Sequence, residues 1–136
     1  MDLQKLSESF LVDDDVAADR LGGMIEKLLP FCTVRKGGAV DLVARNLSGK
    51  NQVKLVLASR LVASKLKGSA VAEEVNTDEI GEFTGLPKSQ AHARAKECVD
   101  ERFAERSGRG IYKAKQHMID GFLAELSGTK PPKERR

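Results

Sequence analysis

The sequence predicts a mainly α-helical fold with small β-hairpins, which belongs to the α+β class. The chain of 136 residues is 40% hydrophobic, but only 4% of its residues are aromatic and none is Trp. The core must therefore be built from Leu, Val, Ile and Ala, residues that pack well between helices. Several stretches also carry apolar residues at helical spacing, and short β-branched runs flank turns that contain glycine. A chain of this length is the size of one domain.

The first expected helix covers residues 16–29 and ends at Pro30. Three acidic residues precede it, which suits the partial positive charge of a helix N-terminus; they are Asp13, Asp14 and Asp15. Apolar residues recur along one face of the helix at Ala17, Leu21, Met24 and Leu28. This stripe either packs into the core or forms the interface of a homodimer.

A hairpin and a long helix are expected next. Residues 31–35 and 39–43 are apolar or β-branched and flank a Lys-Gly-Gly turn, which is typical of a hairpin. A helix is expected at 50–67, with Gly68 at its end. One face of this helix is apolar, and its other faces carry Lys50, Lys54, Arg60, Lys65 and Lys67. Basic residues at such positions either form a solvated face or attract phosphates, as Lys50 and Lys54 could do.

Two further helices, 76–84 and 87–101, are expected on either side of the tight turn Gly85-Leu86-Pro87. Asn76 is a good N-cap, and Glu79 three residues later can complete a capping box. The glycine of the turn supplies a left-handed helix end, and the proline opens the next helix at a position where its missing N–H costs nothing. Small alanines on the inward stripe of the second helix allow it to approach its neighbours closely.

The last elements expected are a hairpin, 102–115, with Arg109 at its tip, and a final helix that stops at Gly128. The apolar face of this helix consists of Ile119, Phe122, Leu123 and Leu126. Residues 129–136 are basic and interrupted by proline, which predicts a disordered tail. The expected organisation is an N-terminal helix and hairpin extension over 1–47, a main domain with a C-terminal helix over 48–128, and the tail.

This order of elements resembles the winged helix-turn-helix superfamily over about residues 48–115. The residues that carry the resemblance are Ile80, Phe83, Gly85-Leu86-Pro87, Ala91, the Gly108-Arg109-Gly110 turn, Ile111 and Tyr112. The resemblance implies a winged helix-turn-helix core in which helix 87–101 is the recognition helix and hairpin 102–115 is the wing. Winged domains bind DNA, RNA or other proteins.

The favoured function is that of a DNA-binding transcriptional regulator or accessory factor. Helix 87–101 would lie in the major groove of double-stranded DNA, and the wing would follow the backbone. Gln90 can pair with adenine, and Lys88 and Arg94 suit guanine or phosphate. The nucleic-acid-binding candidates are Lys88, Ser89, Gln90, His92, Arg94, Lys96, Arg106, Arg109 and Lys113. Each of them can also be an ordinary solvated residue at a helix start or a turn.

The charge pattern leaves an alternative function open. The net charge is +3, but residues 31–68 carry eight basic groups and one acidic group, whereas residues 69–87 carry five acidic groups and no basic one. Such blocks can focus a positive field on one face. The acidic block would repel phosphates if it lay on that face. A protein-protein interaction adaptor without nucleic-acid binding is therefore the alternative, and no constellation of residues indicates an enzyme.

Cysteine and histidine usage predicts no metal and no cofactor. Cys32, Cys98, His92 and His117 are scattered and lack the local pairing of a zinc site. We expect both cysteines to be buried, reduced thiols. No stretch approaches the roughly 20 apolar residues that span a bilayer, and the first ten residues do not resemble a signal peptide. The expected location is the cytoplasm.

Overall fold

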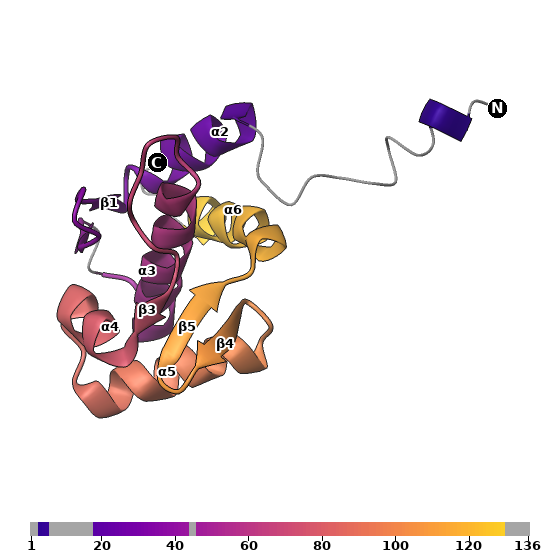
Figure 1. Ribbon diagram of the computed structural model, residues 1–136. Helices are drawn as coiled ribbons and strands as arrows, with labels where there is room; N and C mark the ends of the chain where they lie inside the picture. The colour runs from indigo at the N-terminus through magenta and orange to yellow at the C-terminus, as the bar shows by residue number, and fades with distance from the viewer. Residues whose placement is uncertain (1–2, 6–17, 44–45, 130–136) are drawn as a thin grey trace.

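The computed structural model describes residues 3–5, 18–43 and 46–129. Within these residues the chain has an α+β fold in which two small antiparallel sheets and several helices pack around one central helix (Figure 1). Residues 3–5 form a helical turn. The remaining helices are α2 (Ala18–Leu28), α3 (Gly49–Ser64), α4 (Thr77–Thr84), α5 (Lys88–Asp100), the 3₁₀ helix η1 (Gln116–Met118) and α6 (Ile119–Thr129). The strands are β1 (Cys32–Val34), β2 (Val40–Leu42), β3 (Val75–Asn76), β4 (Ala104–Gly108) and β5 (Ile111–Ala114).

Helix α3 lies in the middle of the fold, with α2 above it, α4 and α5 below it, and α6 beside it (Figure 1). Every residue from 52 to 63 is buried. The expectation that Lys54 and Arg60 lie on outward faces is therefore wrong, because neighbouring elements surround α3 on all sides. The helix also ends at Ser64, three residues earlier than expected, and Gly68 has a left-handed φ of 82° in the loop that follows.

Helix α2 and the β1–β2 hairpin pack against α3. The expected hairpin is confirmed, with Thr33 opposite Asp41. The apolar stripe of α2 lies in the core, since Leu21, Met24 and Leu28 are all buried. The core is continuous from this helix to α6.

The larger sheet has the strand order β3-β5-β4. Its outer strand, β3, was not expected from the sequence, because two residues are too few to show an alternating pattern. Val75 pairs with Tyr112, and Asn76 pairs with Ile111. The hairpin formed by β4 and β5 is confirmed, and it has a bulge between Arg106 and Gly108.

The turn between α4 and α5 is formed largely as expected. The capping box is present: the Asn76 side chain accepts from the Glu79 backbone N–H, and the Glu79 side chain accepts from the Asn76 N–H. Gly85 ends α4 with a φ of 80°. Pro87 is the N-cap residue of α5 instead of its first helical residue. The inward alanine stripe is confirmed, because Ala91 and the later Ala95 and Cys98 are all fully buried.

Helix α6 closes the core with the expected face. Ile119, Phe122, Leu123 and Leu126 are all buried, and the rings of Phe103 and Phe122 meet edge to face with centroids 5.2 Å apart. The helix does not stop at Gly128 but continues to Thr129.

Three expectations fall outside the described residues. They concern the acidic triplet 13–15, the first two residues of the expected helix 16–29, and residues 130–136 of the tail. Among the helices that are described, none combines the length and the apolar character needed to cross a bilayer.

Candidate nucleic-acid interface

Helix α5 exposes five of the six candidate residues that it carries. Ala91 and Ala95 are both buried, and residues four apart lie on the same face of a helix. The opposite face of α5 therefore points outward. Lys88, Ser89 and Gln90 are exposed at the helix start. The exposed face continues through His92 and Lys96.

The β4–β5 turn exposes Arg109 and is held against the first turn of α4. The backbone carbonyl of Gly110 accepts hydrogen bonds from the Thr77 backbone N–H, at 3.0 Å, and from the Thr77 hydroxyl, at 3.2 Å. Gly110 has a φ of 70°, a conformation that a residue with a Cβ adopts only with strain. Arg106 is exposed beside the turn and donates from Nε to the Gly108 carbonyl at 3.2 Å.

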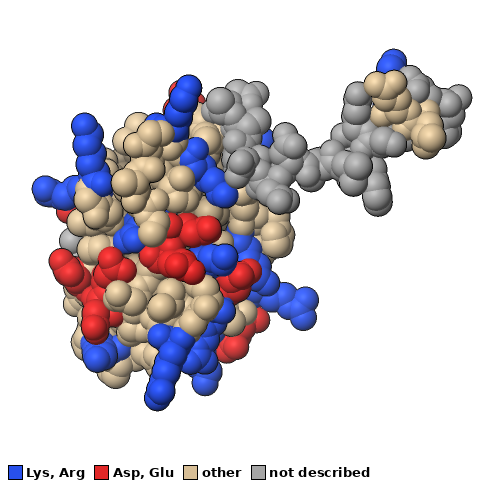
Figure 2. All heavy atoms as spheres, in the orientation of Figure 1, with Lys and Arg blue, Asp and Glu red and all other residues tan. Residues whose placement is uncertain are grey.

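The start of α5 lies beside the same turn of α4. Lys88 Nζ is 3.6 Å from the carboxylate of Asp78, the residue that follows Thr77. The first turn of α4 therefore neighbours both the hairpin tip and the start of α5. Figure 2 shows Lys and Arg side chains projecting from the lower edge of the molecule, where α5 and the hairpin turn lie, and acidic side chains over α4.

Ion pairs balance three of the candidate cations. The pairs are Lys88 with Asp78 at 3.6 Å, Arg94 with Glu97 at 3.3 Å and Lys113 with Glu105 at 3.8 Å. All six side chains are at least 30% exposed, so salt screens these pairs and they are weak. Within the described residues, Lys96, Arg106 and Arg109 have no ion pair, and they supply the uncompensated positive charge of this face.

Arg94 is set apart from the other candidates. A Cβ built on Gly49 at the start of α3 would lie 3.7 Å from Arg94 Cδ, so the stem of the arginine packs along the α3–α5 contact. Its Nε is buried and has no hydrogen-bond partner among the described residues. Arg94 therefore serves partly as packing, and only its outer nitrogens are available to a ligand.

Lys50 and Lys54, which could attract phosphates, share the single carboxylate of Glu101, so only one of their two positive charges is balanced. Both pair with the carboxylate of Glu101, Lys54 at 3.0 Å. Lys54 is also buried, with its Nζ 5.3 Å from the ring centroid of Phe103 and 5.7 Å from that of Phe122. Hydrogen bonds from Lys50 and then Lys54 lower the pKa of the Glu101 carboxyl, and the Glu101 hydrogen bond raises the pKa of Lys50.

Sequence reasoning missed the role of Thr77, which fixes the hairpin tip through both its backbone and its hydroxyl. The local sequence gives no signal for this contact, because Gly110 lies 33 residues further along the chain. Pairing of β3 with β5 brings the two together. The contact between Thr77 and Gly110 could therefore be found only by predicting that β3 pairs with β5.

The described residues contain no group of three or more His, Cys, Asp and Glu side chains that could hold a metal ion. Cys32 and Cys98 are free and buried, as expected. Burial raises the pKa of Cys32 to about 11 and that of Cys98 to about 12. No protein-family model matches the chain, and neither a curated protein nor a solved structure is significantly similar to it.

Proposed function

We propose that residues 48–115 form a winged helix-turn-helix domain that binds double-stranded DNA, in a transcriptional regulator or accessory factor. The order of elements supports this fold: α3, β3, α4, α5, β4 and β5 follow one another, and the strands are arranged β3-β5-β4. In such a domain α5 is the recognition helix and the β4–β5 turn is the wing. The wing is short here, with five residues in β4 and four in β5. Its tip is bonded to Thr77.

One observation carries the proposal: the start of α5 and the β4–β5 hairpin tip both contact the first turn of α4. Thr77 holds the hairpin tip and Asp78 contacts Lys88, so the start of α5 and Arg109 flank one turn of α4. A duplex that received α5 in its major groove, about 12 Å wide, would pass close to the hairpin tip. One surface can therefore make base contacts and backbone contacts at the same time.

The exposed side chains have chemistry suited to those two roles. Gln90 can donate to and accept from the edge of adenine, and Lys88 can donate to guanine. Ser89 and His92 can donate to phosphate oxygens, as can Lys96. Arg106, Arg109 and Lys113 lie on the hairpin and would follow the sugar-phosphate backbone. The outer nitrogens of Arg94 complete the candidate set.

The proposal is tested by fluorescence anisotropy with a labelled generic duplex in about 50 mM salt, where phosphate contacts dominate affinity. The variant K88A/Q90A/R109A is expected to bind at least about tenfold more weakly than the native chain. The control K27A/K36A also removes two positive charges, one from α2 and one from the β1–β2 turn, and neither residue belongs to the candidate interface. It is expected to retain most of the affinity.

Two results would contradict this assignment. Equal losses in the two variants would mean that no particular face is used, and an unchanged affinity of the triple variant would remove these residues from the interface. A native chain without affinity for DNA or RNA at low salt would reject nucleic-acid binding itself.

A protein partner is the alternative ligand for the same surface. The observation that favours it is the acidic partner beside each of Lys88, Arg94 and Lys113. A face that carries both acidic and basic side chains resembles the polar rim of a protein-protein interface more than a phosphate-binding surface, which is mainly basic. Under this alternative, the K88A/Q90A/R109A substitutions weaken binding to a protein partner, and the native chain has no nucleic-acid affinity at low salt.

A further inference from the structure

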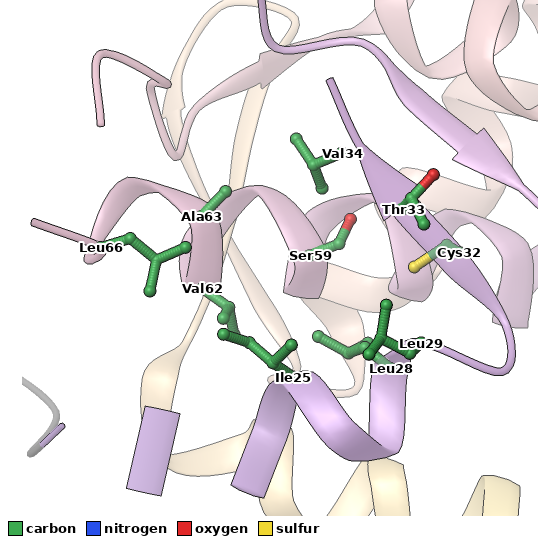
Figure 3. Close-up of a pocket in the computed structure, with 10 residues that line it drawn as sticks. All are labelled: Ile25, Leu28, Leu29, Cys32, Thr33, Val34, Ser59, Val62, Ala63 and Leu66. Atoms are coloured by element: carbon green, nitrogen blue, oxygen red, sulfur yellow. The ribbon is translucent and has the colours of Figure 1, made fainter. Parts of the chain in front are cut away.

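An apolar groove lies between α2, β1 and α3, away from the candidate nucleic-acid interface (Figure 3). It has a volume of about 300 Å³. Its apolar lining includes Ile25, Leu28, Leu29, Val34, Val62 and Leu66. Leu29 is 54% exposed and Leu66 is 39% exposed, although both are large apolar residues. Exposed apolar side chains that gather at a groove mark a binding surface.

A second hollow that carries positive charge adjoins the groove. The two share Val34, Ala63 and Leu66, and the second is also lined by Arg35, Lys36 and Lys67. Arg35 is paired with Asp41 at 2.7 Å. Lys36 and Lys67 are exposed and have no ion pair within the described part of the chain. A segment that fits this surface must therefore combine apolar side chains with negative charge.

We propose that the groove and the charged hollow beside it bind the N-terminal segment of the same chain, residues 2–15. Leu3, Leu6 and Phe10 recur at helical spacing in this segment. Leu3, in the helical turn 3–5, is 76% exposed. Residues 2–15 contain five acidic groups and one basic group, a net charge of −4. Both the apolar stripe and the negative charge of the segment complement this surface. The proposal does not depend on DNA binding.

The covalent connection favours the segment of the same chain over other occupants. The segment leads into Ala18, where α2 begins, and the other end of α2 lines the groove. The helix rises about 15 Å from Ala18 to Leu28, whereas the eight residue steps from Phe10 to Ala18 can span up to about 27 Å. Phe10 can therefore reach the groove. Attachment to the chain also gives the segment an effective concentration that a separate molecule lacks.

The proposal is tested by disulfide trapping in the full chain. Phe10→Cys is combined with Leu66→Cys, which lies on the groove and is already partly exposed. The matched control is Glu8→Cys with Leu66→Cys, because position 8 lies on the opposite side of a helix that carries Leu3 and Phe10. Mild oxidation is expected to form an intramolecular disulfide in the F10C/L66C variant at least several times faster than in the control variant. The oxidised F10C/L66C protein should run as a monomer in denaturing, non-reducing gels.

Two outcomes would overturn the proposal. A disulfide-linked dimer would place the segment in the groove of a second copy, and equal rates for the two pairs would show that tethering alone brings the cysteines together. NMR spectra of the full chain provide an independent readout without new thiols. Leu6→Ser with Phe10→Ser is expected to shift the signals of Val34, Val62 and Leu66, whereas Glu8→Ser leaves them in place. Unshifted signals in the double variant would also reject the proposal.

Discussion

The guanidinium group of Arg60 lies 3.5 Å from the carboxylate of Glu79, and Arg60 is only 5% exposed. Glu79 also completes the capping box of α4, so this contact joins the central helix to the turn that neighbours the hairpin tip. Arg60 further donates to three backbone carbonyl oxygens, those of Gly38, Ala72 and Glu74, at 3.1, 2.7 and 2.9 Å. One buried side chain thereby fixes the loop that leads into β3 and the start of α4.

Replacing Arg60 with Met is expected to destabilise the protein by about 3 kcal/mol, because buried carbonyl groups lose charged hydrogen-bond donors. Urea unfolding measures the change. Arg35→Met is the control, since Arg35 forms an exposed pair whose loss costs at most about 1 kcal/mol. Similar losses in the two variants would show that the Arg60 network contributes little to stability.

Replacing Asn76 with Ala removes the N-cap of α4 and is expected to cost about 1 kcal/mol. Asn76→Asp keeps an oxygen that can accept from the Glu79 N–H and should retain most of the stability. Thermal unfolding of the three proteins gives the comparison. An Asp variant as unstable as the Ala variant would argue against a capping role for this side chain.

The pairs of Glu101 with Lys50 and Lys54 predict a dependence of stability on pH. The pKa of Glu101 is lowered in the folded protein from its ordinary value of 4.5. Its contribution is therefore fully present above that value and is lost as the pH falls through the folded pKa. Glu101→Gln should be less stable than the native chain in urea at pH 7, and the difference should close as the pH falls below 4.5. A difference that stays constant down to pH 2 would contradict this linkage.

The two cysteines are expected to resist modification in the folded state. Burial raises the pKa of Cys32 to about 11 and that of Cys98 to about 12, so few thiolates are present at pH 8 and little thiol surface is accessible. A disulfide reagent such as DTNB should react slowly with both until urea unfolds the chain, and then with both rapidly. Fast labelling of either residue in the native protein would show that its site opens.

Local sequence signals predicted the features that depend on neighbouring residues. The capping box of Asn76 and Glu79, the left-handed Gly85 and the buried alanines of α5 all follow from spacings of three or four residues. The burial of Lys54 and Arg60 could not be predicted in this way, because their partners come from distant segments. Glu101 lies 47 residues after Lys54, and three separate segments supply the partners of Arg60.

The same limit applies to the candidate site. The exposed start of α5 and the exposed Arg109 could be predicted from the helix period and the glycine turn. Their common neighbour could not, because the contact between Thr77 and Gly110 depends on the pairing of β3 with β5. That long-range pairing turns two separate polar segments into one candidate surface.

The central claim, that α5 and the hairpin tip form one phosphate-binding face, is tested most directly by the salt dependence of DNA affinity. The slope of log K against log salt concentration falls by about 0.9 for each phosphate contact that is lost. Lys96→Ala with Arg109→Ala removes two unpaired cations, one from each part of the face. We expect a slope shallower by about 1.8 in this variant and an unchanged slope in K27A/K36A. A slope identical to that of the native chain, or no binding at low salt, would contradict it.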